Sequence, residues 1–247
     1  MSSFMVFFDL GKTLAVKSDG TPILSRTIEE LNMLSENGVQ VVICSGSPID
    51  FLIGVVGQAQ LHEDTILVGE TGGIGQRGVY GGERFSLLPP NVDILNILDT
   101  FSQIEKSICD KFGGWRPRFL RGEVSFNIIF QDEDEKHAIK AVLEENSQLL
   151  KDNSIVAHEW GGIMFELLLE TVDKGTAVKS LAARYGIATE NIIAVGDGIN
   201  DIPMFAQAGT SIGINRKYDG KNHHVVDNIG QAMSLITELV YKNATLF

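Results

Sequence analysis

The sequence predicts an α/β protein with a Rossmann-like parallel-sheet core and an inserted α+β cap domain. Near both ends of the chain, short apolar runs alternate with helical patterns, as expected of parallel strands joined by crossover helices. Between these regions the order changes to helix, two strands, helix, two strands, which is typical of an independent unit with an open sheet. We therefore expect residues 1–81 and 169–247 to form the core and residues 82–168 to form the cap.

The composition excludes several classes of partner. The chain has 247 residues, of which 44% are hydrophobic, and a formal net charge of −12. Because phosphate backbones are bound by clustered Lys and Arg, this balance argues against a nucleic-acid or anionic-membrane surface. No stretch approaches the roughly 20 apolar residues of a membrane span, and no secretory signal is visible, so we expect a cytoplasmic protein. Cys44 and Cys109 form neither a disulfide framework nor a zinc site, and the oligomeric state is left open.

The first core strand ends on a carboxylate. Residues 4–8 are an apolar run typical of a buried strand, and Asp9 follows directly. The Gly-Lys-Thr of residues 11–13 resembles the end of a phosphate-binding P-loop, but that motif needs a glycine where Val6 lies within the strand. Asp9 is therefore either the cap of the following turn or a functional acid at the sheet edge. Residues 15–24 predict a turn or short hairpin.

A helix is predicted from Thr27 to Asn37, because Thr27 and Glu30 form a capping-box pattern and Gly38 follows as a stop. A second buried strand over residues 39–44 comes next. These elements continue the alternation of the core.

The second strand also ends on polar residues. Ser45 and Gly46 follow it, and we expect a helix with Ser47 as its cap and Pro48 at its first position. A hydroxyl at a strand end facing a helix N-terminus suits a phosphate, since free N–H groups and the helix dipole favour an anion. Ser is equally a common helix cap, so this signal is weak by itself.

A third strand over residues 66–68 leads into a glycine-rich stretch, residues 69–75. Because no clear helix follows the glycines, the stretch is not a convincing dinucleotide fingerprint. We expect it to be a connection that leaves the core.

The cap is predicted from helical periodicity and two hairpin patterns. The expected elements are helices over residues 91–110 and 134–150, and strands over residues 118–120, 123–130, 155–159 and 163–169. Arg116, Arg118 and Arg121 form a basic group on the first hairpin. These arginines either contact an anionic part of a substrate or lie in solvent.

The chain then returns to the pattern of the core, with Asp173 as the cap of a helix that begins at Lys174. The further elements are a helix over residues 174–185, a strand over 191–195, a helix ending at 208, a strand over 211–214 and a helix over 229–241. His223 and His224 are expected in a loop, where they lack the further ligands that a metal site needs.

Three strand ends therefore deliver Asp9, Ser45, and the pair Asp197 and Asp201, while Lys174 begins a helix between the last two strands. If the strands share one parallel sheet, these side chains face one crevice. Because gathered carboxylates repel one another, we expect a Mg²⁺ ion held by one or two of them and by a substrate phosphate. Lys174 is either a phosphate ligand or a solvated surface charge.

In this order and spacing, the residues resemble the haloacid dehalogenase superfamily of phosphohydrolases, specifically its Cof-like class, in which a lid is inserted between the second and third motifs. The resemblance covers nearly the whole chain. The four motifs are residues 9–13, Ser45-Gly46, Lys174, and Gly196-Asp197 with Asn200-Asp201.

The resemblance implies a phosphatase in which Asp9 forms an aspartyl-phosphate. Its Mg²⁺ would be bound by the carboxylates of Asp9 and Asp197 and the backbone carbonyl of Gly11. It further implies phosphate binding by Ser45, Gly46, Lys174 and Asn200, with Asp201 and Thr13 in support. The cap resembles the compact lids of archaeal phosphoglycolate and sugar-phosphate phosphatases, so the implied substrate is a small phosphorylated metabolite.

One position departs from the family pattern. The residue two after the nucleophile is normally a second Asp, which protonates the leaving group and then activates water, and here it is Gly11. A general acid/base contributes about 10²–10⁴ in rate. The chain could act on substrates with good leaving groups, borrow an acid or base from the lid or substrate, or bind a phosphorylated ligand without efficient turnover.

Overall fold

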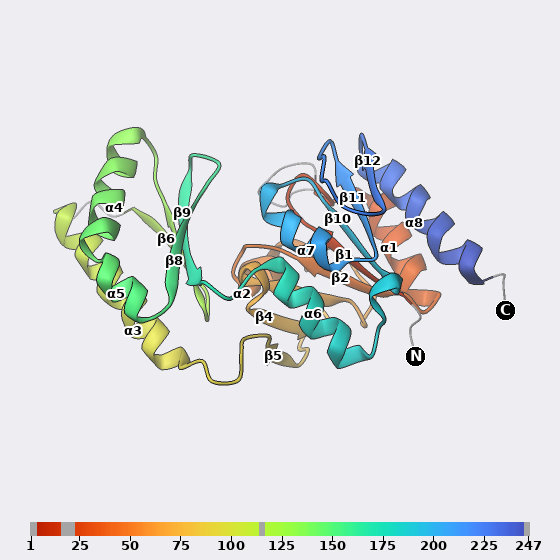
Figure 1. Cartoon of the computed structure of the whole chain (residues 1–247), viewed down its shortest axis with the longest axis horizontal. Helices are drawn as coiled ribbons and strands as arrows, with labels where there is room; N and C mark the ends of the chain where they lie inside the picture. Colours follow the sequence, from red (N-terminus) through yellow and green to blue (C-terminus); the bar gives the residue numbers. More distant parts are fainter. Residues whose placement is uncertain (1–3, 16–22, 114–116, 245–247) are drawn as a thin grey trace. The chain divides into compact units, whose positions relative to one another are not determined.

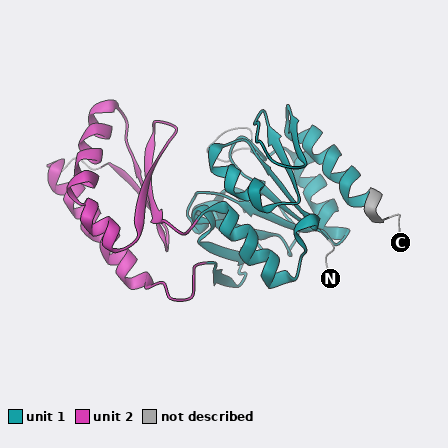
Figure 2. Ribbon diagram, viewed as in Figure 1, with its two compact units in different colours: residues 1–87, 173–247 teal, residues 88–172 magenta. Residues whose placement is uncertain are grey.

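The computed structural model describes residues 4–15, 23–113 and 117–244, so Arg116 and most of the predicted turn over residues 15–24 lie outside the described residues. The chain divides into residues 1–87 with 173–247, and residues 88–172 (Figure 2). The inserted unit begins and ends later than the predicted 82–168. Residues 84–86 form a strand of the core sheet, and Val172 packs in the core of the inserted unit.

The core is an eight-stranded sheet in the order β12-β11-β10-β1-β2-β3-β4-β5 (Figure 1). The six strands from β12 to β3 are parallel, and β4 and β5 are antiparallel. The strands are β1 (Met5–Asp9), β2 (Gln40–Cys44), β3 (Ile66–Gly69), β4 (Ile74–Arg77), β5 (Arg84–Ser86), β10 (Ile192–Gly196), β11 (Thr210–Ile214) and β12 (His223–Val226). The predicted α/β class and parallel-sheet core are confirmed.

Helices cover both faces of this sheet (Figure 1). They are α1 (Ser25–Glu36), α2 (Ile49–Val56), α6 (Lys174–Tyr185), α7 (Ile202–Gln207) and α8 (Ile229–Ala244), with 3-10 turns η1 (Glu70–Gly72), η2 (Thr189–Asn191) and η3 (Ile199–Asp201). On one face α6 and α7 pack on Met5 and Phe7, alternate residues of β1. Helices α1 and α8 contact each other. The middle strand β1 is completely buried, so its end is held rigidly.

Three local predictions for the core are wrong. Helix α1 begins at Ser25 without a side-chain cap, and Thr27 is buried inside it, so the predicted capping box does not form. Helix α2 begins at Ile49, one residue later than predicted, because Pro48 is the N-cap and no side chain caps the helix. His223 and His224 both lie in the edge strand β12 and not in a loop.

The glycine-rich stretch after β3 was predicted to be a connection out of the core, and this prediction is wrong. It forms η1 and then β4, which extends the sheet in the antiparallel direction. Close approach explains one of the glycines, since a Cβ on Gly75 would lie 2.3 Å from the ring of Phe85 in β5. Gly75 therefore serves the packing of this part of the sheet.

The inserted unit has an antiparallel sheet in the order β6-β7-β9-β8, with helices packed on one face. Its elements are α3 (Ile94–Lys111), β6 (Arg118–Arg121), β7 (Ser125–Ile129), α4 (Glu133–Glu145), α5 (Ser147–Asp152), β8 (Ile155–Trp160) and β9 (Met164–Leu169). The predicted second helix is divided at Asn146 into α4 and α5. Large buried side chains such as Phe101, Phe126 and Leu167 give the unit its own core.

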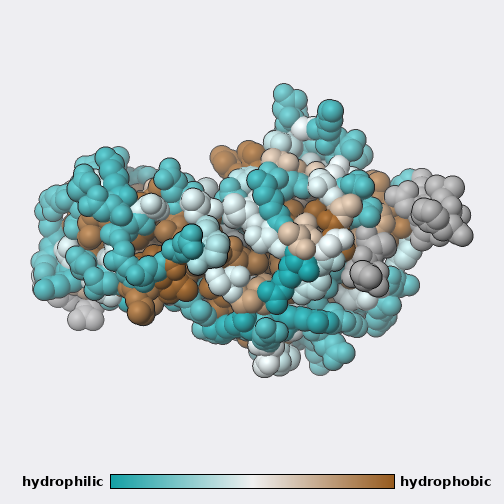
Figure 3. Space-filling view, turned by 60° about the horizontal axis from the view of Figure 1, so that its bottom comes forward, coloured by the Kyte–Doolittle hydropathy of each residue, from teal (hydrophilic) through white to brown (hydrophobic). Residues whose placement is uncertain are grey.

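On the face that Figure 3 shows, hydrophilic residues alternate with patches of hydrophobic ones. Among the helices that the structure describes, none combines the length and the apolar character needed to cross a membrane.

Candidate active site

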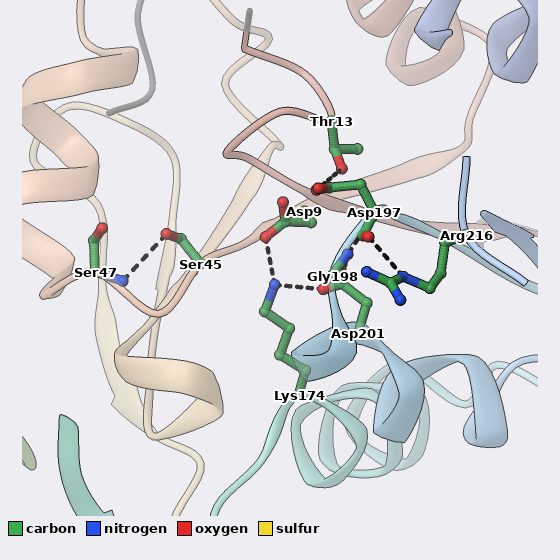
Figure 4. A network of polar contacts seen from close by, with 9 residues as sticks. All are labelled: Asp9, Thr13, Ser45, Ser47, Lys174, Asp197, Gly198, Asp201 and Arg216. Carbon is green, nitrogen blue, oxygen red and sulfur yellow. Dashed lines mark hydrogen bonds and ion pairs between the residues drawn. The ribbon is translucent and has the colours of Figure 1, made fainter. Parts of the chain in front are cut away.

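The carboxyl ends of three neighbouring parallel strands form the site. Strand β1 lies between β2 and β10, and Asp9 pairs in register with Cys44, the last residue of β2. Ser45 and Asp197 are the residues that follow β2 and β10. The predicted convergence of these side chains at one sheet edge is therefore what the topology produces (Figure 4).

Lys174 connects two of the acids. Its ammonium Nζ donates hydrogen bonds to Oδ1 of Asp9 and, at 2.7 Å, to Oδ1 of Asp201 (Figure 4). The side chain is 0% exposed, so Lys174 is not the solvated surface charge that was the alternative. Helix α6 reaches this depth because Gly175 packs on α7, where a Cβ would lie 2.4 Å from the carbonyl oxygen of Pro203.

Asp201 shapes the loop that follows β10. Its Oδ2 accepts hydrogen bonds from the backbone N–H groups of Asp197, at 2.9 Å, and Gly198, at 2.8 Å. Since Oδ1 accepts from Lys174, both carboxylate oxygens of Asp201 are occupied by donors. The side chain of Asp197 is oriented separately by Thr13, whose hydroxyl donates to Oδ1 at 3.1 Å.

The cluster holds three carboxylates and one buried cation, and the pKa values of Asp9, Asp197 and Lys174 are shifted from their ordinary values. Burial raises the pKa of Asp9 from 3.8 to about 7, against the opposing effect of Lys174. Burial also raises the pKa of Asp197. For Lys174, burial would lower the pKa, but the carboxylates of Asp201 and Asp9 outweigh it, so the net shift is upward. Lys174 is therefore protonated throughout the physiological range.

The raised pKa of Asp9 predicts a pH dependence of stability in the metal-free protein. Folding takes up a proton at Asp9 between pH 3.8 and about 7, so this residue makes the free energy of unfolding fall as pH rises through that window. Between pH 4.5 and 7.5 we expect the free energy of unfolding to fall by about 1–3 kcal/mol less in Asp9→Asn than in wild type. Urea unfolding at pH 4.5 and 7.5 in EDTA, for both proteins, measures the difference. Parallel pH profiles for wild type and variant would contradict the assignment.

The acids fit a hard divalent cation. One oxygen each from Asp9, Asp197 and Asp201 lies within 4.8 Å of the others. Because Asp201 is fully occupied, the oxygens left without a hydrogen-bond donor from the described residues are Oδ2 of Asp9 and Oδ2 of Asp197. Mg²⁺ is usually bound in proteins through one or two carboxylates, so two carboxylate oxygens without donors fit this ion.

Apart from Lys174, which begins α6, the predicted phosphate ligands lie in the turns that follow β2 and β10. The buried Ser45 accepts the Ser47 N–H at 3.2 Å through Oγ, so its own hydroxyl hydrogen is available to a ligand. Gly46 follows in the same turn and is half-buried. Asn200 is half-buried in η3 and folds back over Gly198, where a Cβ would lie 2.1 Å from its Oδ1.

The basic group of the inserted unit is divided in its surroundings. The guanidinium of Arg121 pairs with Glu105 at 2.9 Å and lies 5.3 Å from the centre of the Phe126 ring, so it is engaged within that unit. Arg118 is exposed. We keep both as proposals for substrate contact, with Arg118 the freer of the two.

Sequence reasoning missed Glu70 and Arg216. Glu70 is buried in η1 with a left-handed backbone, φ 57°, and its N–H donates to Ser47 O at 2.8 Å, which braces the turn after β2. Arg216 Nε donates to the backbone carbonyl of Asp197 at 2.8 Å. Arg216 follows the end of β11 by two residues, so the strand-end rule applied to a fourth strand would have found it.

Comparison with known proteins identifies the family. The sequence model of the haloacid dehalogenase-like hydrolases matches residues 6–78 and 119–220. The chain belongs to this family. The match confirms the predicted family and the prediction that the chain is a hydrolase.

Two proteins of similar sequence are named phosphoglycolate phosphatase, one from Methanoculleus marisnigri and one from Staphylothermus marinus. The first is 27% identical over 82% of this chain and 83% of its own, and the second 24% identical over 78% and 77%. These names support the enzyme class expected from the sequence, a phosphoric monoester hydrolase.

Solved structures of other proteins share the fold of this chain. A haloacid dehalogenase-like hydrolase from Bacteroides thetaiotaomicron has a TM-score of 0.70 at 18% identity and covers 95% of this chain and 100% of its own. The C-terminal domain of the C. albicans trehalose-6-phosphate phosphatase has a TM-score of 0.69 at 19% identity, covering 97% and 93%. The likeness confirms the fold class predicted from the sequence.

Proposed function

We propose that the chain is a Mg²⁺-dependent phosphatase of a small phosphorylated metabolite, and that it works through an aspartyl-phosphate on Asp9. The observation that carries the proposal is the buried Lys174, which holds one oxygen each of Asp9 and Asp201 at the carboxyl edge of the sheet. This contact supports the proposal because it sets the ammonium group of Lys174 beside Asp9, the proposed nucleophile, within a group of acids. The phosphatase relatives support a small phosphorylated substrate, such as phosphoglycolate or a sugar phosphate.

In the first step, a carboxylate oxygen of Asp9 attacks phosphorus and the bond from phosphorus to the leaving oxygen breaks. Lys174 keeps the Asp9 carboxylate in one orientation and supplies positive charge to the transferring phosphoryl group. Ser45 and Asn200 donate hydrogen bonds to the other phosphoryl oxygens, with the Gly46 turn beside them. Water then hydrolyses the aspartyl-phosphate and releases inorganic phosphate.

Asp9 and Asp197 would bind the Mg²⁺, with the backbone carbonyl of Gly11 as a third ligand, while Asp201 and Thr13 orient the loop and the side chain of Asp197. When bound, the ion supplies charge neutralisation to the acids and to the transferring phosphoryl group. Ionisation of Asp9, which burial opposes in the metal-free protein, is favoured by a cation at this position.

With Gly11 in place of an acid, we expect rapid hydrolysis only of substrates with good leaving groups. Without an acid at this position, an alkoxide leaving group must take its proton from water or from the substrate. The leaving group of an acyl phosphate is a carboxylate, which needs no such proton. We therefore expect acyl phosphates to react faster than alkyl monoesters.

Hydrolysis of phosphoglycolate, glucose 6-phosphate and acetyl phosphate, each with Mg²⁺ or with EDTA, tests the proposal. We expect turnover that requires Mg²⁺, with acetyl phosphate the best substrate. Mg²⁺-independent turnover would overturn the metal assignment. Tight phosphate binding without turnover of any substrate would replace the phosphatase by a protein that binds phosphorylated ligands.

A further inference from the structure

The connection between β11 and β12, residues 215–222, reaches the acidic cluster from outside the four motifs. Arg216 Nε donates to the carbonyl oxygen of Asp197 at 2.8 Å (Figure 4). The N–H of the same peptide group belongs to Gly198 and donates to Asp201 Oδ2 at 2.8 Å. Both ends of this peptide group are therefore held, one end by each side chain.

Arg216 is itself fixed by the edge strand. Its carbonyl oxygen lies 2.9 Å from His223 Nε2, and His223 Nδ1 lies 2.8 Å from Ser211 Oγ. Because a carbonyl oxygen can only accept, Nε2 must carry the hydrogen. The rings of Phe205 and Tyr218 pack on His223 at 5.5 Å and 5.6 Å. The histidine thus has a structural partner on each ring nitrogen, which explains it without a metal.

The turn that carries Arg216 has a demanding backbone. A Cβ on Gly213 would lie 2.0 Å from the carbonyl oxygen of Arg216, so only glycine allows the chain to fold back this closely. Asn215 has a left-handed backbone, φ 52°, which Asn tolerates better than most residues. Such a turn returns the Arg216 side chain to the end of the sheet, where a longer loop would not.

We propose that Arg216 is a positioning residue for Asp197, the expected Mg²⁺ ligand. Thr13 orients the carboxylate of Asp197, Asp201 holds its N–H, and Arg216 holds its carbonyl oxygen. Without Arg216 the peptide group after Asp197 keeps only one anchor, the hydrogen bond to Asp201, so the backbone that carries the Asp197 carboxylate is held less firmly. This inference rests on the proposed function, because it takes Mg²⁺ as the ion bound by Asp9 and Asp197.

The sign of the effect separates positioning from simple charge. A guanidinium next to a cation site repels the cation, so removing its charge alone would tighten Mg²⁺ binding. Removing an anchor of a ligand weakens binding, typically by 10–100-fold. The two mechanisms predict opposite changes in the dissociation constant for Mg²⁺.

Calorimetric titration with Mg²⁺, without substrate, distinguishes them. We compare wild type, Arg216→Ala, Arg216→Lys and the control Lys217→Ala, which removes a positive charge from the exposed neighbouring residue. We expect the dissociation constant to rise about 10-fold or more in Arg216→Ala and by less in Arg216→Lys, which keeps the charge and one donor. Lys217→Ala should stay within about twofold of wild type or bind more tightly.

An unchanged or lower dissociation constant in Arg216→Ala, or an equal loss in Lys217→Ala, overturns the positioning role. Thermal unfolding of each variant shows whether it is folded. If Arg216→Ala is not folded, the affinity of Arg216→Lys for Mg²⁺ tests the positioning role. Wild-type affinity in Arg216→Lys would show that the planar guanidinium is dispensable and would overturn that role. A wild type that does not bind Mg²⁺ would overturn this inference together with the metal of the proposed function, whereas a failure confined to the variants overturns the inference alone.

Discussion

Asp9→Asn is expected to lower kcat at least about 10³-fold, because an amide cannot form the aspartyl-phosphate. The substitution keeps the size of the side chain and removes only the nucleophilic charge. The site should remain folded, since burial opposes the ionised form of Asp9 in the metal-free protein. We therefore expect the variant to be inactive and, at pH 7.5 in EDTA, at least as stable as wild type.

Steady-state hydrolysis of acetyl phosphate at saturating Mg²⁺ provides the rate, and urea unfolding provides the stability. Asp219→Asn is the matched control, since it makes the same chemical change at an exposed residue of the β11–β12 connection. The control should keep wild-type rates. Appreciable turnover by folded Asp9→Asn would assign the nucleophile to another residue and would remove the main support for the aspartyl-phosphate.

Gly11→Asp is expected to raise kcat/KM for alkyl phosphates about 10²–10⁴-fold, by restoring an acid for the leaving group and a base for water. Acetyl phosphate should gain far less, because its leaving group needs no proton. Gly11 is not among the described glycines that have a left-handed backbone. A residue with an L side chain can therefore adopt the backbone conformation at this position. Gly11 is also half-buried, so the position is partly exposed to solvent.

Gly11→Asn separates the acid from the side chain's bulk. It has the same shape but transfers no proton, so we expect no gain in rate. Equal gains from Asp and Asn would point to a steric or backbone effect. If Gly11→Asp is folded and binds Mg²⁺ but hydrolyses alkyl phosphates no faster than wild type, the result would favour a protein that binds a phosphorylated ligand without turnover.

Much of this architecture could be read from the sequence. The parallel core, the inserted helix-strand-strand repeats and the start of α6 at Lys174 all follow from local signals, namely apolar period, turn residues and the Asp173 cap. Even the meeting of Asp9 and Asp197 could be expected, because parallel strands must end at the same edge of a sheet. Where these signals are short in range and repeated, sequence reasoning succeeds.

It fails where a residue's role depends on distant neighbours. Thr27 looked like a cap but is buried inside α1, because tertiary packing overrides a local capping pattern. The glycines after β3 resembled a loop, and pairing with β3 and Phe85 turned them into a strand. No sequence pattern distinguishes such a strand from a connection.

The depth of Lys174, and the contact that Arg216 makes with Asp197, are decided by the tertiary structure. A lysine at a helix start is ordinarily solvated, and it becomes a buried link between Asp9 and Asp201 only because Gly175 lets α6 close on α7. Arg216 reaches Asp197 across 19 positions of the sequence, through a turn braced by the edge strand. Types and order of the functional residues are local properties of the chain, but charge balance and orientation depend on packing between segments that the sequence keeps apart.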